Sequence, residues 1–196
     1  MATVASASAA APPSPAPNDA VLIQRTRNGD GTAFDELVTR YMRQAFSVAF
    51  RILGQREDSE DLVQESFMAV LKKLDSYDSS WPFAPWFFRI VVNRALSERK
   101  SRARRQTEEI PENAVTTNPS PARSAEEREL RERVTAALAT LPPKDKVMIE
   151  LFEFEGFNSN EIGEILGVAP GTVRWQLHQT RKKLRAALAA CQESVR

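Results

Sequence analysis

The sequence contains one cysteine, Cys191, and one histidine, His178, among its 196 residues. A single cysteine excludes an internal disulfide and a cysteine-based zinc site, and it is typical of a protein kept in a reducing cytoplasm. A single histidine leaves no convincing Ser-His-Asp or Cys-His arrangement. The sequence also has no glycine-rich phosphate-binding loop and no metal-ligand spacing. It therefore offers no case for an enzyme, a metal site or a bound cofactor.

Long apolar runs are also missing, which predicts no membrane insertion. Residues 1–18 lack the basic start and the leucine-rich middle of a signal peptide, and their Ala, Pro and Ser content predicts a disordered tail. The net charge is only +1. Any binding to nucleic acid must therefore depend on local patches of charge, because the field of the whole chain is weak.

Most of the remaining chain repeats apolar residues with a helical period, and no alternating strand pattern of useful length occurs. Predicted helices cover 19–28, 34–52, 58–74 and 85–105, the third starting at Asp58 or Ser59 and burying Leu71 with its other apolar residues. Residues 106–125 hold three prolines and no apolar stripe, which predicts an extended linker. The helical period returns from Glu126, and Pro142-Pro143 separates two helices. The predicted fold is all-α, with two small helical domains, an N-terminal helical bundle (19–105) and a C-terminal four-helix domain (126–190). The tails are 1–18 and 191–196.

The most informative stretch covers 159–185 and predicts two short helices joined by a tight turn. Ser159 is the expected N-cap, Gly167 the left-handed residue that ends the first helix, and Pro170 the start of the second. The second helix has one stripe that must face protein, made of Val173, Leu177, Thr180 and Leu184. Its other face is basic and carries no acid. A positive helix held against a partner helix fits a DNA major groove. The alternative is a helical hairpin with a solvated basic face.

Two other stretches carry unusual side chains. Five acids and no base lie between Glu57 and Glu65, which indicates either a solvated face or a docking surface for a basic partner. A polar loop at 74–82 holds Tyr77 and Trp81. Aromatic rings near basic residues suit unstacked bases, although these rings are equally compatible with the core. The basic run RKSRARR at 99–105 is either a solvated helix end or a track for a phosphate backbone.

In this order, these parts resemble the extracytoplasmic-function (ECF) group of bacterial RNA polymerase sigma factors in the sigma-70 family. Two blocks carry the resemblance. Residues 57–96 contain DLVQE followed by WFFRIVVNRA and are similar to the family's second conserved region. Residues 138–188 contain LPP followed by EIGEILGVAPGTVR and are similar to the fourth. Each fragment alone is weak, but their order and spacing are specific.

The resemblance implies a subunit that binds core RNA polymerase and promoter DNA, and that helps to open the duplex. The positions implied for docking on core polymerase are Asp58, Asp61, Gln64 and Glu65. The positions implied for the −10 element, where a flipped base is captured, are Tyr77, Asp78, Ser79, Ser80, Trp81, Phe83, Asn93 and Arg94. The positions implied for the −35 element are Arg174, Trp175, His178, Gln179, Arg181 and Lys182, the last two mostly on phosphates.

The resemblance also implies a cytoplasmic location, a linker threaded through the polymerase, and an anti-sigma factor as a further partner. The chain departs from the family's usual pattern at Asp78, where a basic residue is common, and at Trp175, where a small polar residue is usual. Two other functions fit parts of the sequence. One is a stand-alone helix-turn-helix regulator whose N-terminal bundle senses a ligand or dimerises, and the other is a protein-interaction adaptor. The acidic block and the aromatic loop favour the sigma factor, because a plain regulator needs neither.

Overall fold

The computed structural model describes residues 18–108, 136, 138 and 141–193, and all regular structure in these residues is helical. The elements are α1 (Asp19–Arg27), α2 (Gly31–Leu53), α3 (Arg56–Lys73), η1 (Leu74–Ser76), α4 (Phe83–Glu108), α6 (Pro143–Ile149), η2 (Glu150–Phe154), α7 (Ser159–Leu166) and α8 (Pro170–Glu193). The prediction of an all-α fold is confirmed. Residues 109–135, which include most of the predicted linker and the first part of the helix expected from Glu126, lie outside the described residues. Of the helices described, none is both long enough and apolar enough to cross a membrane.

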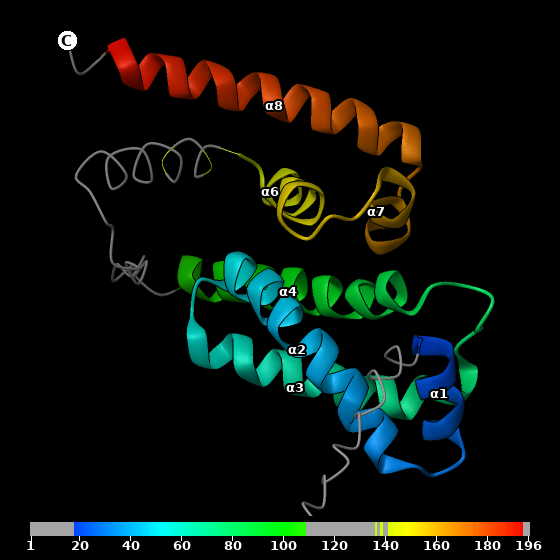
Figure 1. Cartoon of the computed structure of the whole chain (residues 1–196). Helices are drawn as coiled ribbons and strands as arrows, with labels where there is room; N and C mark the ends of the chain where they lie inside the picture. The colour runs from blue at the N-terminus through cyan, green and yellow to red at the C-terminus, as the bar shows by residue number, and fades with distance from the viewer. Residues whose placement is uncertain (1–17, 109–135, 137, 139–140, 194–196) are drawn as a thin grey trace, which may run out of the picture.

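Helices α1 to α4 form the first lobe, in which α2 crosses α3 and α4 while α1 packs at one end (Figure 1). The core of this lobe is rich in aromatic rings. Phe67 of α3 stacks on Phe87 of α4 with 4.6 Å between ring centroids, and Tyr41 of α2 lies 5.9 Å from Phe87. Phe87 is fully buried, and a side chain of this size contributes about 1.5–3 kcal/mol when it leaves water. The core therefore fixes α4 against α2 and α3.

Side-chain caps and glycines set most of the boundaries in this lobe. Asn18 and Asp30 accept backbone N–H groups at the starts of α1 and α2, and Gly54 ends α2 with a φ of 77°. The predicted start of α3 at Asp58 or Ser59 is wrong, because the helix begins at Arg56 and the Ser59 hydroxyl donates back to the Gln55 carbonyl. The predicted burial of Leu71 is also wrong, since this side chain is 40% exposed.

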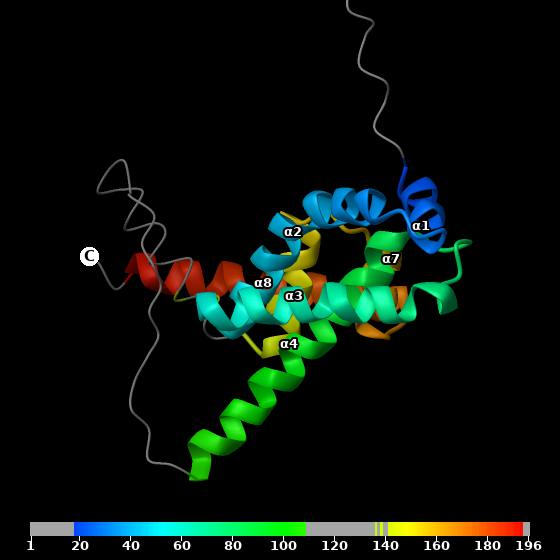
Figure 2. The same cartoon turned by 90° about the horizontal axis from the view of Figure 1, so that it is seen from below.

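Helix α4 is longer than its sequence pattern predicts at both ends. It begins at Phe83, two residues before Pro85, and it continues to Glu108, beyond the expected boundary at 105. Figure 2 shows the C-terminal part of α4 extending away from the rest of the molecule. The predicted linker therefore begins with helix, because Gln106, Thr107 and Glu108 continue α4.

Helices α6, α7 and α8, with the π-helical turn η2, form the second lobe. The predicted N-cap Ser159 is wrong by one residue. Asn158 caps α7, and its side chain and that of Glu161 form a reciprocal capping box. Gly167 ends α7 with a φ of 67°, and α8 starts at Pro170, both as predicted. Helix α8 continues to Glu193, past the predicted domain end at 190.

The two lobes pack directly against each other, with α7 packed over the N-terminal half of α4 (Figure 1). Phe88 of α4 meets Phe157, just before α7, at 5.0 Å between ring centroids. The Gln44 amide of α2 donates to the Glu155 carbonyl at 3.3 Å, and Arg51 of α2 forms a 2.7 Å ion pair with Glu150. We call these three pairs the interlobe contact. The buried hydrophobic residues of the two lobes form one continuous cluster, and the Phe88–Phe157 pair belongs to it.

Candidate nucleic-acid interface

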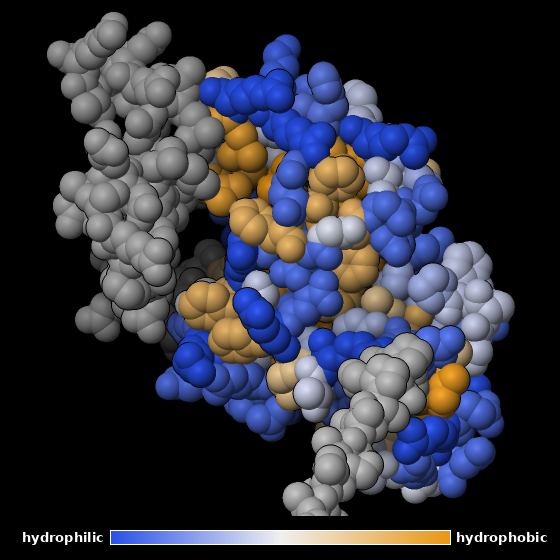
Figure 3. All heavy atoms as spheres, in the orientation of Figure 1, coloured by the Kyte–Doolittle hydropathy of each residue, from blue (hydrophilic) through white to orange (hydrophobic). Residues whose placement is uncertain are grey.

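The outer face of α8 is the most positively charged candidate surface. Arg174, Trp175, His178 and Lys182 are exposed, and Trp175 keeps 62% of its surface in contact with solvent. Val173, Leu177 and Thr180 are buried on the opposite face, as the sequence predicts. Strongly hydrophilic residues lie along the upper edge of the molecule, where α8 runs (Figure 3). The stripe thus anchors α8 and turns the predicted −35 side chains outward.

Two basic side chains of α8 are drawn toward the second lobe itself. Arg181 pairs with Glu153 of η2 at 2.5 Å, and its guanidinium lies 4.8 Å from the centre of the Phe152 ring. Lys183 lies 3.8 Å from Asp145 of α6. Gln179 is half-buried. Arg174 and Lys182 therefore present their charges to solvent more freely than Arg181, which was expected to contact phosphates.

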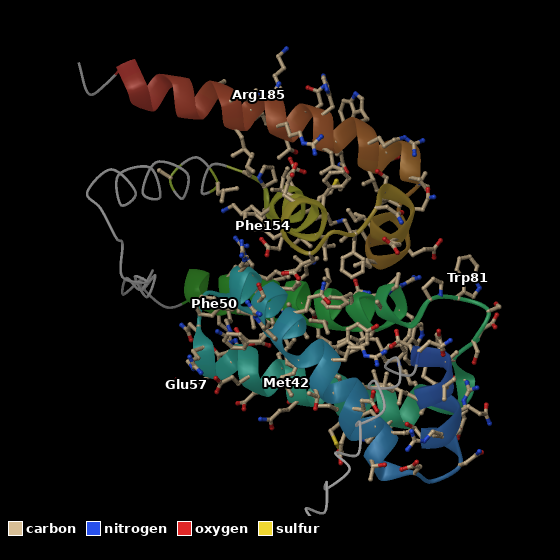
Figure 4. The ribbon with its side chains drawn as sticks, in the orientation of Figure 1. Met42, Phe50, Glu57, Trp81, Phe154 and Arg185 are labelled. Carbon is tan, nitrogen blue, oxygen red and sulfur yellow. The ribbon has the colours of Figure 1, made fainter. Side chains whose placement is uncertain are left out.

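The loop between η1 and α4 contains a hydrogen-bonded turn with one exposed ring. The Asp78 carboxylate accepts the Ser80 backbone N–H at 2.9 Å, and this bond holds the pKa of Asp78 below its usual range. Asp78, Ser79 and Ser80 are exposed, and Trp81 is 56% exposed. Figure 4 shows the Trp81 side chain at the edge of the molecule, directed away from α4. An exposed indole beside short polar groups supplies both a stacking face and hydrogen-bonding edges.

Tyr77 and Phe83 do not share this exposure. They are 5% and 3% exposed, and their rings meet at 5.9 Å in an edge-to-face contact. Burial raises the pKa of Tyr77, and its hydroxyl donates to the Trp81 carbonyl. The expectation that both rings are free to stack on a base is therefore corrected. They pack beneath the loop as part of the core, because burying two large aromatic rings stabilises the protein more than leaving them in water.

The acidic surface of α3 lies at the opposite end of the first lobe from Trp81, as the position of Glu57 shows (Figure 4). Asp61 and Gln64 are exposed there. Asp58 instead pairs with Arg102 of α4 at 2.5 Å, and this bond lowers the pKa of Asp58. The basic run at 99–105 therefore partly neutralises the acidic block, and neither is purely a solvated face.

The structure brings two of the predicted sites together. Glu65, expected to contact polymerase, pairs with Arg94, expected to contact DNA, at 2.8 Å. Asn93, next to Arg94 on α4, is exposed. An ion pair between partly exposed side chains is worth about 0–1 kcal/mol, so either partner can exchange it for a stronger contact.

A cavity of about 220 Å³ lies between the lobes, beside Trp81. Its walls come from the aromatic loop and α4 on one side and from α7 on the other. The lining residues are Trp81, Pro82, Pro85, Trp86, Arg89, Asn160, Glu161 and Glu164. Sequence reasoning did not find this cavity, because no local pattern shows that α7 folds back over the loop.

Comparison with known proteins identifies both lobes. Residues 37–105 match the family described as Sigma-70 region 2, and residues 131–184 match Sigma-70, region 4. The chain is 34% identical over 183 residues to the ECF RNA polymerase sigma factor SigE of Mycolicibacterium smegmatis, covering 90% of this chain and 70% of that protein. It is 28% identical over 176 residues to the ECF RNA polymerase sigma factor SigW of Bacillus subtilis, covering 85% of this chain and 94% of that protein.

Two solved structures share the fold. The structure of CnrH in complex with the cytosolic domain of CnrY matches with a TM-score of 0.66 and 28% identity, over 88% of this chain and 97% of that one. The sigma factor RpoE from Bartonella quintana, in complex with the anti-sigma factor NepR, matches with a TM-score of 0.67 and 23% identity, over 80% of this chain and 96% of that one.

Proposed function

Because this chain belongs to the ECF group of the sigma-70 family of bacterial RNA polymerase sigma factors, we propose that its two lobes read two separate promoter elements while bound to core polymerase. It directs transcription initiation and performs no catalysis of its own. The observation that supports assigning one promoter element to the second lobe is the outward placement of Arg174, Trp175 and His178 on a helix whose other face is buried. We assign residues 19–105 to region 2 and 126–190 to region 4.

The −35 element is read by α8. An arginine in the major groove makes bidentate bonds to guanine, and a glutamine does the same to adenine, each worth about 1–3 kcal/mol of discrimination. Arg174 is the exposed arginine nearest the start of α8, the end of a recognition helix that contacts base edges. Gln179, half-buried, is the expected partner for adenine. Trp175 covers thymine methyls or deoxyribose. Lys182, and Arg181 once released from Glu153, neutralise phosphates.

The −10 element is read by the aromatic loop and α4. Trp81 stacks on a base that has left the duplex, and Asp78, Ser79 and Ser80 offer polar groups to its edge. Tyr77 and Phe83 support Trp81 from below. Asn93 and Arg94 contact the upstream side of the same element. Stacking on an aromatic ring contributes about 1–3 kcal/mol per base, which offsets part of the cost of opening the duplex.

Core polymerase docks on the acidic surface of α3. Asp61 and Gln64 are the exposed contacts, and Glu65 and Asp58 join them by exchanging their pairs with Arg94 and Arg102. A negative surface steers a basic partner and fixes its register. This role places the chain in the cytoplasm, where core polymerase works. An anti-sigma factor is a further partner: of the two similar solved structures, the sigma factor RpoE is in complex with the anti-sigma factor NepR, and CnrH is in complex with the cytosolic domain of CnrY.

Reconstitution tests the proposal. The purified chain is mixed with core polymerase and sheared genomic DNA from the source organism, and the 5′ ends of the transcripts are mapped. We expect discrete start sites that require both components, preceded by a shared pair of elements. A chain that binds DNA but never binds core polymerase at low salt would instead be a stand-alone regulator, and the proposal would fail.

A further inference from the structure

Arg27, the last residue of α1, lies against the loop that carries Trp81. Its Nε and Nη2 donate to the Leu74 carbonyl at 3.1 and 2.7 Å. Nη2 also donates to the Tyr77 carbonyl, and Nη1 donates to the Ser79 hydroxyl at 3.2 Å. One guanidinium thus holds three points of a six-residue segment that follows α3. The contact spans more than 45 residues of sequence, and no sequence pattern indicates it.

Helix α1 is itself held rigidly, so Arg27 is a fixed point. Leu22 and Ile23 of α1 are fully buried in the first lobe. At its other end, Asp19 pairs with Arg40 at 2.5 Å and accepts a hydrogen bond from the Tyr41 hydroxyl. A short helix of nine residues is marginal alone, and these contacts to α2 secure it. The position of Arg27 is therefore set by the core of the lobe.

The bonds continue from Arg27 to the exposed indole. The Tyr77 carbonyl accepts from Arg27, and the Tyr77 hydroxyl donates to the Trp81 carbonyl. The backbone N–H of Trp81 in turn donates to the backbone carbonyl of Asp78 at 3.2 Å. The backbone on both sides of the indole is thus fixed before any DNA arrives. A side chain that is pre-ordered loses less conformational entropy when a base stacks on it.

We propose that Arg27 is a positioning residue for −10 recognition, which orders the loop so that Trp81 can receive a flipped base. The inference rests on the proposed function of the loop and extends it to a helix outside that surface. Lysine cannot replace this arginine fully, because a single ammonium cannot address three acceptors with the fixed fork of a guanidinium. Alanine removes all of these bonds and leaves the Tyr77 carbonyl without its Arg27 donor.

The first test does not depend on DNA. Backbone hydrogen exchange of the full chain is compared for wild type, Arg27→Ala, Arg27→Lys and Arg25→Ala. Arg25 lies on the same helix but pairs with Asp30, so it controls for the loss of a cation from α1. We expect exchange at the amides of Tyr77 and Trp81 to rise at least tenfold in Arg27→Ala, less in Arg27→Lys, and to stay unchanged in Arg25→Ala. Unchanged exchange in Arg27→Ala would overturn the proposal.

The second test uses the holoenzyme and a promoter recovered by reconstitution. Permanganate reactivity of unpaired thymines measures opening, and a fluorescent single strand carrying the −10 element measures capture. We expect Arg27→Ala to weaken both at least tenfold while holoenzyme formation stays within twofold of wild type. Arg27→Lys recovers part of the loss. Wild-type capture by Arg27→Ala, or an equal loss in Arg25→Ala, overturns the positioning role.

Two further outcomes are informative. If Arg27→Ala lowers holoenzyme formation as much as capture, the residue is merely structural, and Ser79→Ala provides the check. That variant removes one of the bonds from Arg27 without removing α1. Because Ser79 is itself assigned to the edge of the base, the check is hydrogen exchange in the absence of DNA, where the amides of Tyr77 and Trp81 should exchange about two- to threefold faster than in wild type if positioning is correct. If the wild-type chain itself forms no holoenzyme, the proposed function fails, whereas the exchange result still reports on the loop.

Discussion

The carboxylate of Glu150 gives the protein a stability that depends on pH. Glu150 lies in η2, is almost fully buried, and meets Arg51 of the other lobe at 2.7 Å. This contact joins Arg51 Nε to Glu150 Oε1, and its angle lies outside the range of a hydrogen bond. Removal from water raises the pKa of Glu150 to about 7, against an ordinary value of 4.5, although Arg51 works in the opposite direction and Glu155 adds to the rise. The folded protein therefore holds a proton on Glu150 more tightly than the unfolded chain does.

The sign and size of the effect follow from these two values. A raised pKa in the folded state contributes stability that is fully present below pH 4.5 and is lost as the pH rises to about 7. A difference of about 2.5 pH units corresponds to about 3 kcal/mol at 1.36 kcal/mol per unit. Because Arg51 is partly open to solvent, we expect about 2–3 kcal/mol. Glutamine cannot ionise, so Glu150→Gln should lose this dependence.

The assay is urea unfolding of wild type and Glu150→Gln at pH 5, 6, 7 and 8. The free energy of unfolding of Glu150→Gln should rise by about 2–3 kcal/mol relative to wild type between pH 5 and pH 8. Other groups that titrate in this range are common to both proteins and cancel in the difference. Glu153→Gln is the matched control, because Glu153 is an exposed neighbour paired with Arg181 and should change stability by less than about 1 kcal/mol at every pH.

A difference between wild type and Glu150→Gln that stays constant within about 0.5 kcal/mol across this range would refute the reasoning. It would mean that Glu150 reaches water in the folded protein, and that the interlobe contact does not bury its carboxylate. A difference that falls with rising pH would have the wrong sign and would mean that Arg51 stabilises the charged form more than burial opposes it.

Three other predictions concern the DNA-reading surfaces and the turn between α7 and α8. Arg174→Ala should reduce discrimination at one −35 base pair by about 1–3 kcal/mol. Lys182→Ala should weaken binding evenly across sequences and lower the slope of log K against log salt concentration by about 1. Competition binding to mutated −35 duplexes at several salt concentrations measures both effects. Trp81→Ala should impair promoter opening more than duplex binding and leave thermal stability nearly unchanged, as permanganate footprinting and melting curves can show; equal losses in both would return Trp81 to a structural role. Gly163→Ala should destabilise the second lobe by about 1–3 kcal/mol in urea unfolding, because a Cβ there would lie 2.7 Å from the Val168 carbonyl oxygen, and an unchanged midpoint would show that the turn can shift.

Much of the fold follows from local patterns. The period of apolar residues from Phe34 to Ile52 predicts α2 closely, and Gly54 and Gly167 mark helix ends because both adopt a positive φ. Helix starts are less certain from sequence. Both Asn158 and Ser159 are good caps, and only the reciprocal bond to Glu161 decides between them. Errors of this kind move a boundary without changing the architecture.

The candidate sites were predictable where exposure follows from helical periodicity. The face of α8 that carries Arg174 and Trp175 is an example, since Val173 and Leu177 fix its rotation. The aromatic loop was harder, because an irregular segment has no period to separate Tyr77, which is buried, from Trp81, which is exposed. These site assignments remain predictions until the variants are tested.

The remaining features depend on contacts between distant segments. Arg27 holds a loop that begins 47 residues later, and its helix has no motif to announce this role. Phe88 of α4 is fully buried, and one of the rings that contact it is Phe157 of the other lobe. Such pairs become visible only when the chain has folded.

The shared cavity of Trp81 and Glu164 limits what this arrangement can do on a promoter. By their names, the −10 and −35 elements lie about 25 base pairs apart, which is roughly 85 Å along a straight duplex at ~3.4 Å per base pair. An α8 of 24 residues is only about 36 Å long. If Trp81 reads one element and α8 the other, as we propose, two lobes that meet in one cavity through Trp81 and α7 cannot span that distance, so α7 would have to leave the loop before both elements are occupied. The 28 residue steps from Glu108 to Ala136, the next described residue and a helical one, set an upper limit of about 100 Å on the span of this connection. A connection of that length would allow the two lobes to separate, and the contacts between α7 and α4 are among those that would have to break.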